Sequence, residues 1–386
     1  MVSKKISVAV LGSTGSIGKA SMSILEKNSK FFKVDLISCN KNIRILKKQI
    51  NKFLPKYVLI SDQNAFNKVK KIKFKKKIIF IQNTNIIKNI KKKFDKVILG
   101  ISSIHGLRYA FDFLPISKEI LIANKETIVC GGNFFLKFAK KNKCKISSID
   151  SEHFCLSNLL KKINIMDIDK IYITASGGPF LNKKINEISR VKPRFALQHP
   201  KWKMGKKISI DSATMANKGL EIIEASILFK INPEMLKIKI HKESKVHAIV
   251  ILKNGIVHLL AHNTSMKIPI ENALLNNKSI LIEKNFFKNK NFFFSFDETN
   301  LKKFKMVFLA YKALRMGHRA CIFYNVINDL LVNSYLKNRI FFYEIYNKLN
   351  KIMNSLYLKK YFNKKIRTIE DIYATISFAK TFENKI

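Results

Sequence analysis

The chain has 386 residues, of which 47% are hydrophobic, and its 73 Lys and Arg against 26 Asp and Glu give a formal net charge of +47. The length exceeds one ordinary domain, so we expect two or three, and the apolar content suffices for packed cores. No stretch approaches the ~20 apolar residues of a membrane span, and the N-terminal apolar run stops at Gly12, which argues against a signal peptide and a membrane partner.

The positive charge would ordinarily indicate a nucleic-acid-binding protein. The Lys residues are, however, scattered through every segment beside abundant Asn, Ile and Phe, which indicates compositional drift rather than a specific nucleic-acid surface. Such a charge still attracts small phosphorylated molecules. The five cysteines are odd in number and show no CxxC spacing, so we expect free thiols in a reducing, cytoplasmic setting. A basic nucleic-acid-binding protein remains an alternative.

The N-terminus predicts a dinucleotide cradle. A buried strand from Ile6 to Leu11 runs into the glycine-rich turn 12–18, and a helical pattern follows through Leu25. Glycines let the backbone approach a pyrophosphate, and a helix N-terminus offers N–H donors to it. The spacing is GxxGxxG rather than the commoner GxGxxG, so a plain strand-to-helix turn is the alternative.

The end of the second strand, at about residues 34–38, favours NADP over NAD. An NAD enzyme places a carboxylate at this strand end to hold the ribose diol. Asp35 precedes two further strand residues and lies too early. The strand end instead carries Cys39, Asn40, Lys41 and Asn42, and a cation with amides suits a ribose 2′-phosphate.

Further strands are expected at 57–60, 78–81, 97–99, 120–123 and 145–149. Their alternation with helical segments predicts an α/β fold with a doubly wound parallel sheet. Ligands gather at the carboxyl ends of such strands. Two polar motifs follow strands there, Asn124-Lys125-Glu126 and Asp150-Ser151-Glu152-His153.

The second motif suggests a metal site. Asp150 and Glu152 are two residues apart, which places both on one side of an extended backbone. With Glu221 they would bring three carboxylates to one point, which suits Mg²⁺ or Mn²⁺. The alternative is a solvated strand-end turn or a helix N-cap, with His153 as a packing residue.

The next predicted strand, 171–174, runs into Ser176-Gly-Gly-Pro-Phe180, where two glycines allow the backbone to approach an anion; a bare turn is the alternative. Residues 199–224 hold the single Trp, a loop centred on Gly205, and a helix that buries Leu220, Ile223, Ile227 and Leu228 on one face. Polar groups lie on or beside this face, namely Asn217, Glu221 and Glu224. They indicate a site rather than an ordinary charged helix edge, because buried carboxylates need a partner or a metal.

The last third is predicted to be helical. Residues 276–300 have little periodicity and are interpreted as a linker, in which 292–296 forms a short strand or a docking segment. From Leu301 onwards helical periods dominate. A stripe of Phe304, Val307, Phe308 and Tyr311 is expected to be core rather than a binding groove.

These motifs, in this order and spacing, resemble the 1-deoxy-D-xylulose 5-phosphate reductoisomerase family. The match is good over about residues 6–275 and weaker beyond, where Asn325-Val-Ile-Asn328-Asp329 is similar to the family's Asn-Ala-Ala-Asn-Glu. The resemblance implies a homodimer with an NADPH-binding domain (1–149), a catalytic domain (150–275) that holds the metal, substrate, lid and dimer interface, a linker (276–300) and a C-terminal helical bundle (301–386). It also implies conversion of a phosphorylated sugar, 1-deoxy-D-xylulose 5-phosphate, to 2-C-methyl-D-erythritol 4-phosphate by isomerisation and NADPH reduction, in non-mevalonate isoprenoid synthesis.

Site roles are carried over by the resemblance, position by position. The metal ligands would be Asp150, Glu152 and Glu221. Lys125 and Ser151 would contact substrate hydroxyls, His199 would contact substrate, and the catalytic set would comprise Lys125, Glu152, His199 and Glu221. The substrate phosphate would be held by Ser176, Ser212, Asn217 and Lys218. Trp202 and Met204 would belong to a mobile lid, and NADPH would contact Thr14, Gly15, Ser16, Ile17, Lys41, Asn42, Asn124, Glu126 and Gly205.

Some positions depart from the family pattern. The family's Gly before Lys41 is Asn40, the usual Asn after Asp-Ser-Glu-His is Phe154, and a His-Pro-Gln-Ser-x-x-His motif appears as 241–247 with Lys-Glu in place of Pro-Gln. None of these removes a catalytic group. A rival hypothesis is another NADP oxidoreductase, such as a dehydrogenase of a phosphorylated polyol, that performs no rearrangement.

Overall fold

The structure is a computed structural model that describes residues 4–82, 84, 87, 90, 92–202, 204–276 and 293–385. The chain forms two compact units. Unit 1 comprises residues 1–127, 135–150 and 265–282, and unit 2 comprises 128–134, 151–264 and 283–386. Most of the predicted linker, residues 277–292, lies outside the described residues. The segment 265–282 belongs to unit 1, and the C-terminal helices share unit 2 with residues 151–264.

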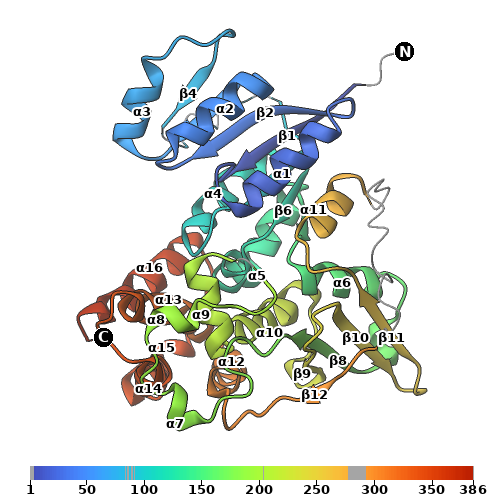
Figure 1. The fold of residues 1–386 in the computed structure, drawn as a ribbon, viewed down its shortest axis with the longest axis vertical. Helices are drawn as coiled ribbons and strands as arrows, with labels where there is room; N and C mark the ends of the chain where they lie inside the picture. The colour runs from blue at the N-terminus through green and yellow to red at the C-terminus, as the bar shows by residue number, and fades with distance from the viewer. Residues whose placement is uncertain are drawn as a thin grey trace. The chain divides into compact units, whose positions relative to one another are not determined.

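Unit 1 is built on a seven-stranded sheet in the order β4-β3-β2-β1-β5-β6-β7, with parallel pairing throughout. The inner strands β1, β2, β3 and β5 are mostly buried apolar runs, as expected for parallel strands covered on both faces, whereas the edge strands β4 and β7 are more exposed. Their bounds are β1 Ile6–Leu11, β2 Phe32–Cys39, β3 Tyr57–Ile60, β4 Ile79–Ile81, β5 Lys96–Leu99, β6 Glu119–Ile122 and β7 Lys145–Ser148 (Figure 1). The predicted parallel α/β sheet is therefore confirmed.

Helices follow the strands of unit 1 in alternation, and one apolar cluster packs α1, α2, α3 and α11 against β1, β2 and β3. The helix α5 starts directly after β6 and is interrupted at Gly132, where the backbone is not helical. The bounds are α1 Ser16–Lys27, α2 Ile43–Phe53, α3 Gln63–Lys70, α4 His105–Phe113, α5 Lys125–Lys141 and α11 Lys267–Leu274.

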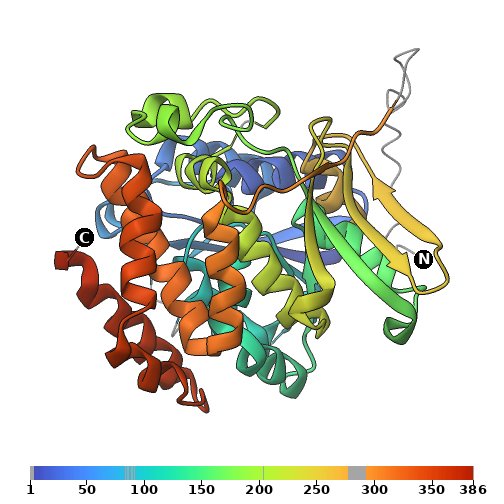
Figure 2. The ribbon, with the colours of Figure 1, turned by 90° about the horizontal axis from the view of Figure 1, so that it is seen from below.

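Unit 2 contains a mixed five-stranded sheet in the order β11-β10-β8-β9-β12. Only the β8–β9 pair is parallel. Helices α6 and α10 lie beside this sheet (Figure 2). They share with it an apolar core that includes Leu156, Ile173 and Ile222. The bounds are β8 Ile168–Ala175, β9 Leu236–Ile240, β10 Val246–Leu252, β11 Val257–Ala261, β12 Asp297–Glu298, α6 Ser151–Leu160, α7 Ile185–Ile188, α8 Pro193–Ala196, α9 Lys206–Thr214 and α10 Ala216–Phe229.

The C-terminal part of unit 2 is helical, as expected. The long helix α13 is buried along most of its length and lies at the centre of this group. The bounds are α12 Lys305–Met316, α13 His318–Leu336, α14 Phe342–Met353, α15 Leu356–Phe362 and α16 Ile369–Lys380. The search for membrane-spanning helices finds none among the described residues.

Four local expectations need correction. Residues 206–214 form a helix, α9, that the sequence analysis treated as loop, and Met215 separates it from α10 with a left-handed backbone (φ 62°). Glu152 lies in the first turn of α6 rather than on extended backbone, because β7 ends at Ser148. Ile227 and Leu228 are half-buried, since α10 is buried mainly between Ala216 and Ala225. In the predicted Phe stripe, Phe304 and Val307 are core, whereas Phe308 is 51% exposed.

Candidate functional site

The glycine-rich turn after β1 is packed so tightly that glycine is needed at two of its positions. Gly12 has φ 78°, and a Cβ placed on it would lie 2.9 Å from the carbonyl oxygen of Gly100. A Cβ on Gly18 would lie 2.2 Å from the oxygen of Gly12. The turn therefore folds back against the start of α1, and the glycines permit this approach.

The N-terminus of α1 is open to a ligand. Gly15 is its N-cap, and no side chain accepts from the first N–H groups. These groups and the partial positive charge of the helix form a site for an anion such as a pyrophosphate. Gly15 and Ser16 are exposed, and Thr14 and Ile17 are half-buried. Four of the nine residues predicted to contact the cofactor thus lie at this helix start, and the cradle fits the NADPH pyrophosphate.

The end of β2 has the polarity expected for a nucleotide 2′-phosphate. Asp35 is buried within the strand, where its carboxylate accepts from the Ser7 hydroxyl at 2.6 Å, so it is not available at the strand end. Lys41 is exposed, with Nζ 3.8 Å from the Asp62 carboxylate. Asn42 caps α2 by accepting from the backbone N–H of Ile45. An exposed cation next to a helix N-terminus favours an anionic group here.

Residues 124–126 stand where β6 passes into α5. Asn124 is the N-cap: its Oδ1 accepts from the N–H of Thr127, and its Nδ2 donates to the carbonyls of Ile101 and Ser103. Because its side chain is used in these bonds, Asn124 would contact the cofactor through its backbone or act through the loop that it holds. Lys125 is 5% exposed, and its ammonium lies 3.1 Å from the carboxylate of Asp150. Glu126 is buried in the first turn of α5.

Three carboxylates offer ligand atoms that lie close together. Asp150 is joined by the chain to the start of α6, which carries Glu152, and Glu221 projects from α10. One oxygen from each lies within 4.8 Å of the others. Glu221 is 1% exposed. Carboxylate oxygens in this number are the ligands that Mg²⁺ and Mn²⁺ prefer, so the predicted metal ligands fit such an ion.

Donors of α10 and α6 hold the carboxylates in place. The ammonium of Lys218 lies 2.7 Å from Oε1 of Glu152 and 2.6 Å from Oε2 of Glu221. Asn217 donates to the other oxygen of Glu221 at 2.6 Å, and the Ser151 hydroxyl donates to Oε2 of Glu152 at 2.6 Å. These charge-assisted bonds balance part of the negative charge. Lys218 and Asn217, predicted for the phosphate, thus also contact the carboxylates.

A buried histidine supports the two helices that carry the carboxylates. Nε2 of His153 is 3.0 Å from the backbone oxygen of Glu221, and its Nδ1 is 3.3 Å from the carboxylate of Glu224. Both side chains are almost fully buried. His153 therefore ties α6 to α10 directly behind the carboxylates. Glu224 therefore reaches the carboxylate site through this histidine.

The Ser176-Gly-Gly loop, α9 and the start of the 199–205 segment lie together. A Cβ on Gly178 would lie 2.7 Å from the carbonyl oxygen of Ser212, so the loop packs directly on α9. The hydroxyl of Ser176 is 3.0 Å from Nε2 of His199. The Ser176 and Ser212 hydroxyls, together with Asn217, are donors of the kind a phosphate requires.

His199 is held in its neutral form. Burial and then the positive charge of Lys218 lower its pKa to about 4. Its Nδ1 accepts from the backbone N–H groups of Lys201 and Trp202, at 3.1 and 2.9 Å. The proton of the neutral ring is therefore on Nε2, which faces Ser176. The following Gly205 has no atom within 4 Å of the position of a Cβ, so the end of this segment is open.

The sequence analysis assigned no site role to two residues that lie near the carboxylates, His247 and His262. His247 of β10 lies with Nδ1 4.0 Å from Oε1 of Glu152, and its ring stacks on His262 at 3.9 Å. Burial, and then His247, lowers the pKa of His262 to about 4. The ring of Trp202 meets that of His247 edge-on. The His-x₅-His spacing of 241–247 was the signal available in the sequence.

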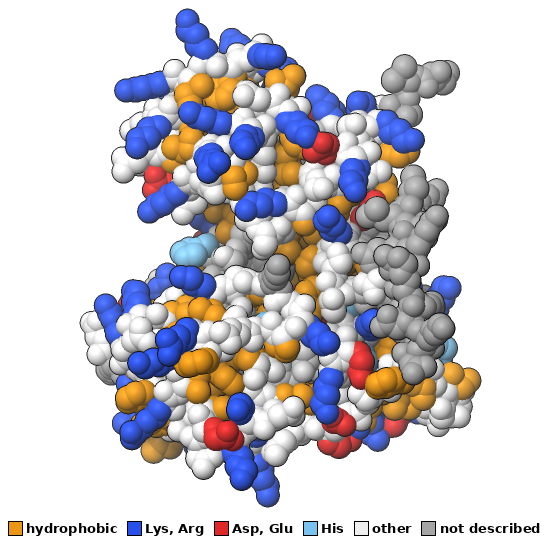
Figure 3. Space-filling model, viewed as in Figure 1, with side chains coloured by type: hydrophobic (Ala, Val, Ile, Leu, Met, Phe, Trp, Pro, Cys, Tyr) orange, Lys and Arg blue, Asp and Glu red, His pale blue; other side chains and the backbone are white. Residues whose placement is uncertain are grey.

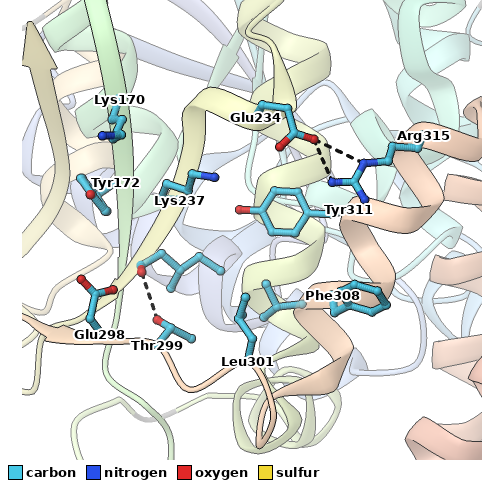
Figure 4. Close-up of a pocket in the computed structure, with 12 residues that line it drawn as sticks. Lys170, Tyr172, Glu234, Lys237, Glu298, Thr299, Leu301, Phe308, Tyr311 and Arg315 are labelled. Carbon is cyan, nitrogen blue, oxygen red and sulfur yellow. Dashed lines mark hydrogen bonds and ion pairs between the residues drawn. The ribbon is translucent and has the colours of Figure 1, made fainter. Parts of the chain in front are cut away.

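A pocket of about 310 Å³ elsewhere in unit 2 is a weaker candidate for the functional site than the three carboxylates. Its two carboxylates are paired: Glu234 with Arg315, as Figure 4 shows, and Glu298 with Lys239. Phe308 and Tyr311 line it, so this part of the predicted Phe stripe faces a pocket. On the face shown in Figure 3, Lys and Arg are distributed widely rather than gathered into one patch.

Comparison with known proteins gives one consistent family. The family model described as 1-deoxy-D-xylulose 5-phosphate reductoisomerase matches residues 8–132, and the two models of its C-terminal domains match 146–229 and 262–382. The reductoisomerase of Pelagibacter ubique is 40% identical over 374 residues, with 95% of each chain covered. That of Clostridium novyi is 36% identical over 382 residues, with 97% of each covered.

Solved structures similar to this chain belong to the same family. The reductoisomerase of Zymomonas mobilis in complex with NADPH is 26% identical, with a TM-score of 0.87 and 99% of each chain covered. A DOX-P reductoisomerase in complex with NADPH, fosmidomycin and magnesium is 28% identical, with a TM-score of 0.89 and 98% of each chain covered. On its motifs, its fold and these similarities, the chain belongs to the 1-deoxy-D-xylulose 5-phosphate reductoisomerase family.

Proposed function

We propose that the protein converts 1-deoxy-D-xylulose 5-phosphate to 2-C-methyl-D-erythritol 4-phosphate, using NADPH and Mg²⁺ or Mn²⁺, in the non-mevalonate route to isoprenoid precursors. The observation that carries this proposal is the convergence of Asp150, Glu152 and Glu221 on one point, in a chain that also holds a dinucleotide cradle. A simple dehydrogenase needs the cradle but has no use for three converging carboxylates.

Two bound groups supply chemistry that side chains lack. NADPH would supply the hydride, and Asp150, Glu152 and Glu221 would hold a divalent ion that would act as a Lewis acid towards the substrate's oxygens. Lys125, with its ammonium beside Asp150, is placed to donate to a developing oxyanion. Ser151 is placed to contact a substrate hydroxyl, because its own hydroxyl points at Glu152.

The phosphate end of the substrate is assigned to the Ser176 loop, Ser212, Asn217 and Lys218. Neutral His199 donates through Nε2 to Ser176 and leaves that hydroxyl's proton directed to a phosphate oxygen. Lys218 contributes positive charge to both the carboxylates and this pocket. The segment that includes Trp202, Met204 and Gly205 would close over the substrate and exclude water, and Gly205 would meet NADPH.

The remaining assignments follow from the same family relationship. We assign NADPH binding to 1–149, catalysis to 150–275, a linker to 276–300 and a helical domain to 301–386, in a homodimer. The cysteines of the described chain are free and buried, which supports a cytoplasmic location.

The proposal is tested by incubating the protein with NADPH, Mg²⁺ and 1-deoxy-D-xylulose 5-phosphate. NADPH consumption is expected, and removal of the metal with EDTA is expected to stop it. A phosphorylated polyol dehydrogenase would keep consuming NADPH in EDTA. A nucleic-acid-binding protein would show no consumption at all, and would instead bind DNA tightly with a steep salt dependence.

A further inference from the structure

Helix α13 contacts α9, which carries part of the proposed phosphate site, through a buried carboxylate of α9. Asp211 of α9 is 1% exposed. Its Oδ1 accepts from Nδ2 of Asn328 at 2.7 Å, and its Oδ2 lies 2.9 Å from the ammonium of Lys207. The same ammonium is 2.9 Å from the carboxylate of Asp329, so α9 and α13 are joined by a network of four side chains.

This network is placed next to the donors of the phosphate site. Asp211 immediately precedes Ser212, and adjacent residues of a helix point about 100° apart. Fixing Asp211 on the α13 side therefore fixes the direction in which Ser212 points. The carbonyl of Ser212 also supports Gly178 of the Ser176 loop, so the orientation of α9 sets the position of both hydroxyls.

A second contact with α13 acts on the start of α10. A Cβ on Gly219 would lie 2.5 Å from the hydroxyl of Tyr324 on α13 and 2.9 Å from Ala310 on α12. Gly219 directly follows Lys218. Tyr324 is fully buried, and its hydroxyl donates to the carbonyl of Met306. The C-terminal helices thus hold both segments that carry phosphate donors.

Burying a carboxylate costs desolvation free energy, which hydrogen-bond and ion-pair partners must offset. Asp211 is held by partners from two helices, although an apolar residue would pack α9 without that cost. We propose that Asn328 and Asp329 of α13 are positioning residues for substrate phosphate binding, acting through Asp211 and Lys207 on Ser212. This inference rests on the proposed function, since it concerns the phosphate of that substrate.

The sequence offers a matched control. Asn325 lies one turn before Asn328 on the same helix, is equally buried at 0% exposure, and also donates from Nδ2, but to the sulfur of Cys130. Replacing either Asn with Ala removes a buried amide from α13. Only Asn328→Ala removes a hydrogen-bond partner of Asp211, which keeps its contact with Lys207.

The test measures binding of inorganic phosphate by the fluorescence of Trp202, the single Trp of the chain. Asn328→Ala is expected to weaken phosphate binding about ten-fold, the size of one lost hydrogen bond to a charged group, and Asn325→Ala less than about two-fold. In steady state, Asn328→Ala is expected to raise KM for the sugar phosphate while kcat and KM for NADPH change little. Equal effects of the two variants would mean that α13 acts only as a support, and would overturn the inference.

A second variant exchanges the side chains of residues 211 and 328. Asp211→Asn combined with Asn328→Asp rebuilds the bond in the opposite direction and is expected to restore phosphate binding to within about three-fold. If Asn328→Ala does not fold, phosphate binding by this double variant is compared with phosphate binding by Asp211→Asn alone. If the double variant binds phosphate no better than Asp211→Asn, the inference is refuted. An inactive wild-type protein would instead refute the proposed function, whereas active wild-type protein with insensitive variants would refute only the role of α13.

Discussion

Adding one methyl group at Gly18 should damage NADPH binding and stability together. The new Cβ would lie 2.2 Å from the Gly12 oxygen and 2.5 Å from backbone atoms of Ser13. Backbone atoms cannot rotate away, so the turn or α1 must move by about 1 Å before the contact reaches the ordinary 3.4 Å. Overpacking of this kind costs about 1–3 kcal/mol, and a 1 Å misplacement of a binding group costs on the order of 100-fold in function.

The assay combines urea unfolding with NADPH titration. We expect Gly18→Ala to lose about 2 kcal/mol and to bind NADPH on the order of 100-fold more weakly. Gly15→Ala is the matched control: its Cβ would lie an ordinary 3.4 Å from the Gly12 oxygen, so stability should hold while NADPH affinity falls. Wild-type stability and affinity in Gly18→Ala would refute the proposed packing of the cradle.

Three further predictions concern unit 2. Glu221→Gln should weaken Mn²⁺ binding by calorimetry more than about 100-fold, whereas the equally buried Glu224→Gln, which acts through His153, should lose only about ten-fold; equal losses would argue against Glu221 as a ligand. The pKa of His199 is lower in the folded protein, at about 4, than its ordinary 6.5, so its contribution to stability is present above pH 6.5 and is lost as the pH falls towards 4. Protonation of Nδ1 would also break its bonds from the 201 and 202 amides, so Trp202 fluorescence should change near pH 4, and a midpoint near 6.5 would contradict the assignment. Lys303→Met should cost about 1.5 kcal/mol in urea unfolding, because its ammonium donates to the carbonyls of residues 180, 181 and 183, while exposed Lys302→Met should cost nearly nothing.

The parallel sheet was predictable because its strands are short apolar runs between turn residues. The predicted strands 6–11 and 57–60 agree with β1 and β3 in full, and the other predicted strands of this sheet agree to within a few residues. Helix α9 was missed for a physical reason. Its sequence, Lys-Lys-Ile-Ser-Ile-Asp-Ser-Ala-Thr, has no clear apolar stripe and is rich in residues of low helix propensity. The break after it falls at Met215, which carries no glycine or proline signal.

The candidate site, like the fold, was predicted from the sequence only in part. The convergence of Asp150, Glu152 and Glu221 was predicted from their types and order together with the family resemblance, although Glu152 reaches the point from a helix rather than from extended backbone. The contacts of Lys218 with both glutamates, and the approach of His247 to Glu152, depend on how β10, α6 and α10 pack. Such contacts between distant segments leave no local pattern in one sequence.

The rearrangement itself is the central claim, and the carbon skeleton of the product tests it most directly. We would supply 1-deoxy-D-xylulose 5-phosphate labelled with ¹³C, together with NADPH and Mg²⁺, and examine the product by NMR. The account predicts the branched 2-C-methyl-D-erythritol 4-phosphate, with its new carbon–carbon bond, and none of it with Glu221→Gln. An unbranched deoxypentitol phosphate, made by reduction alone, would contradict the account.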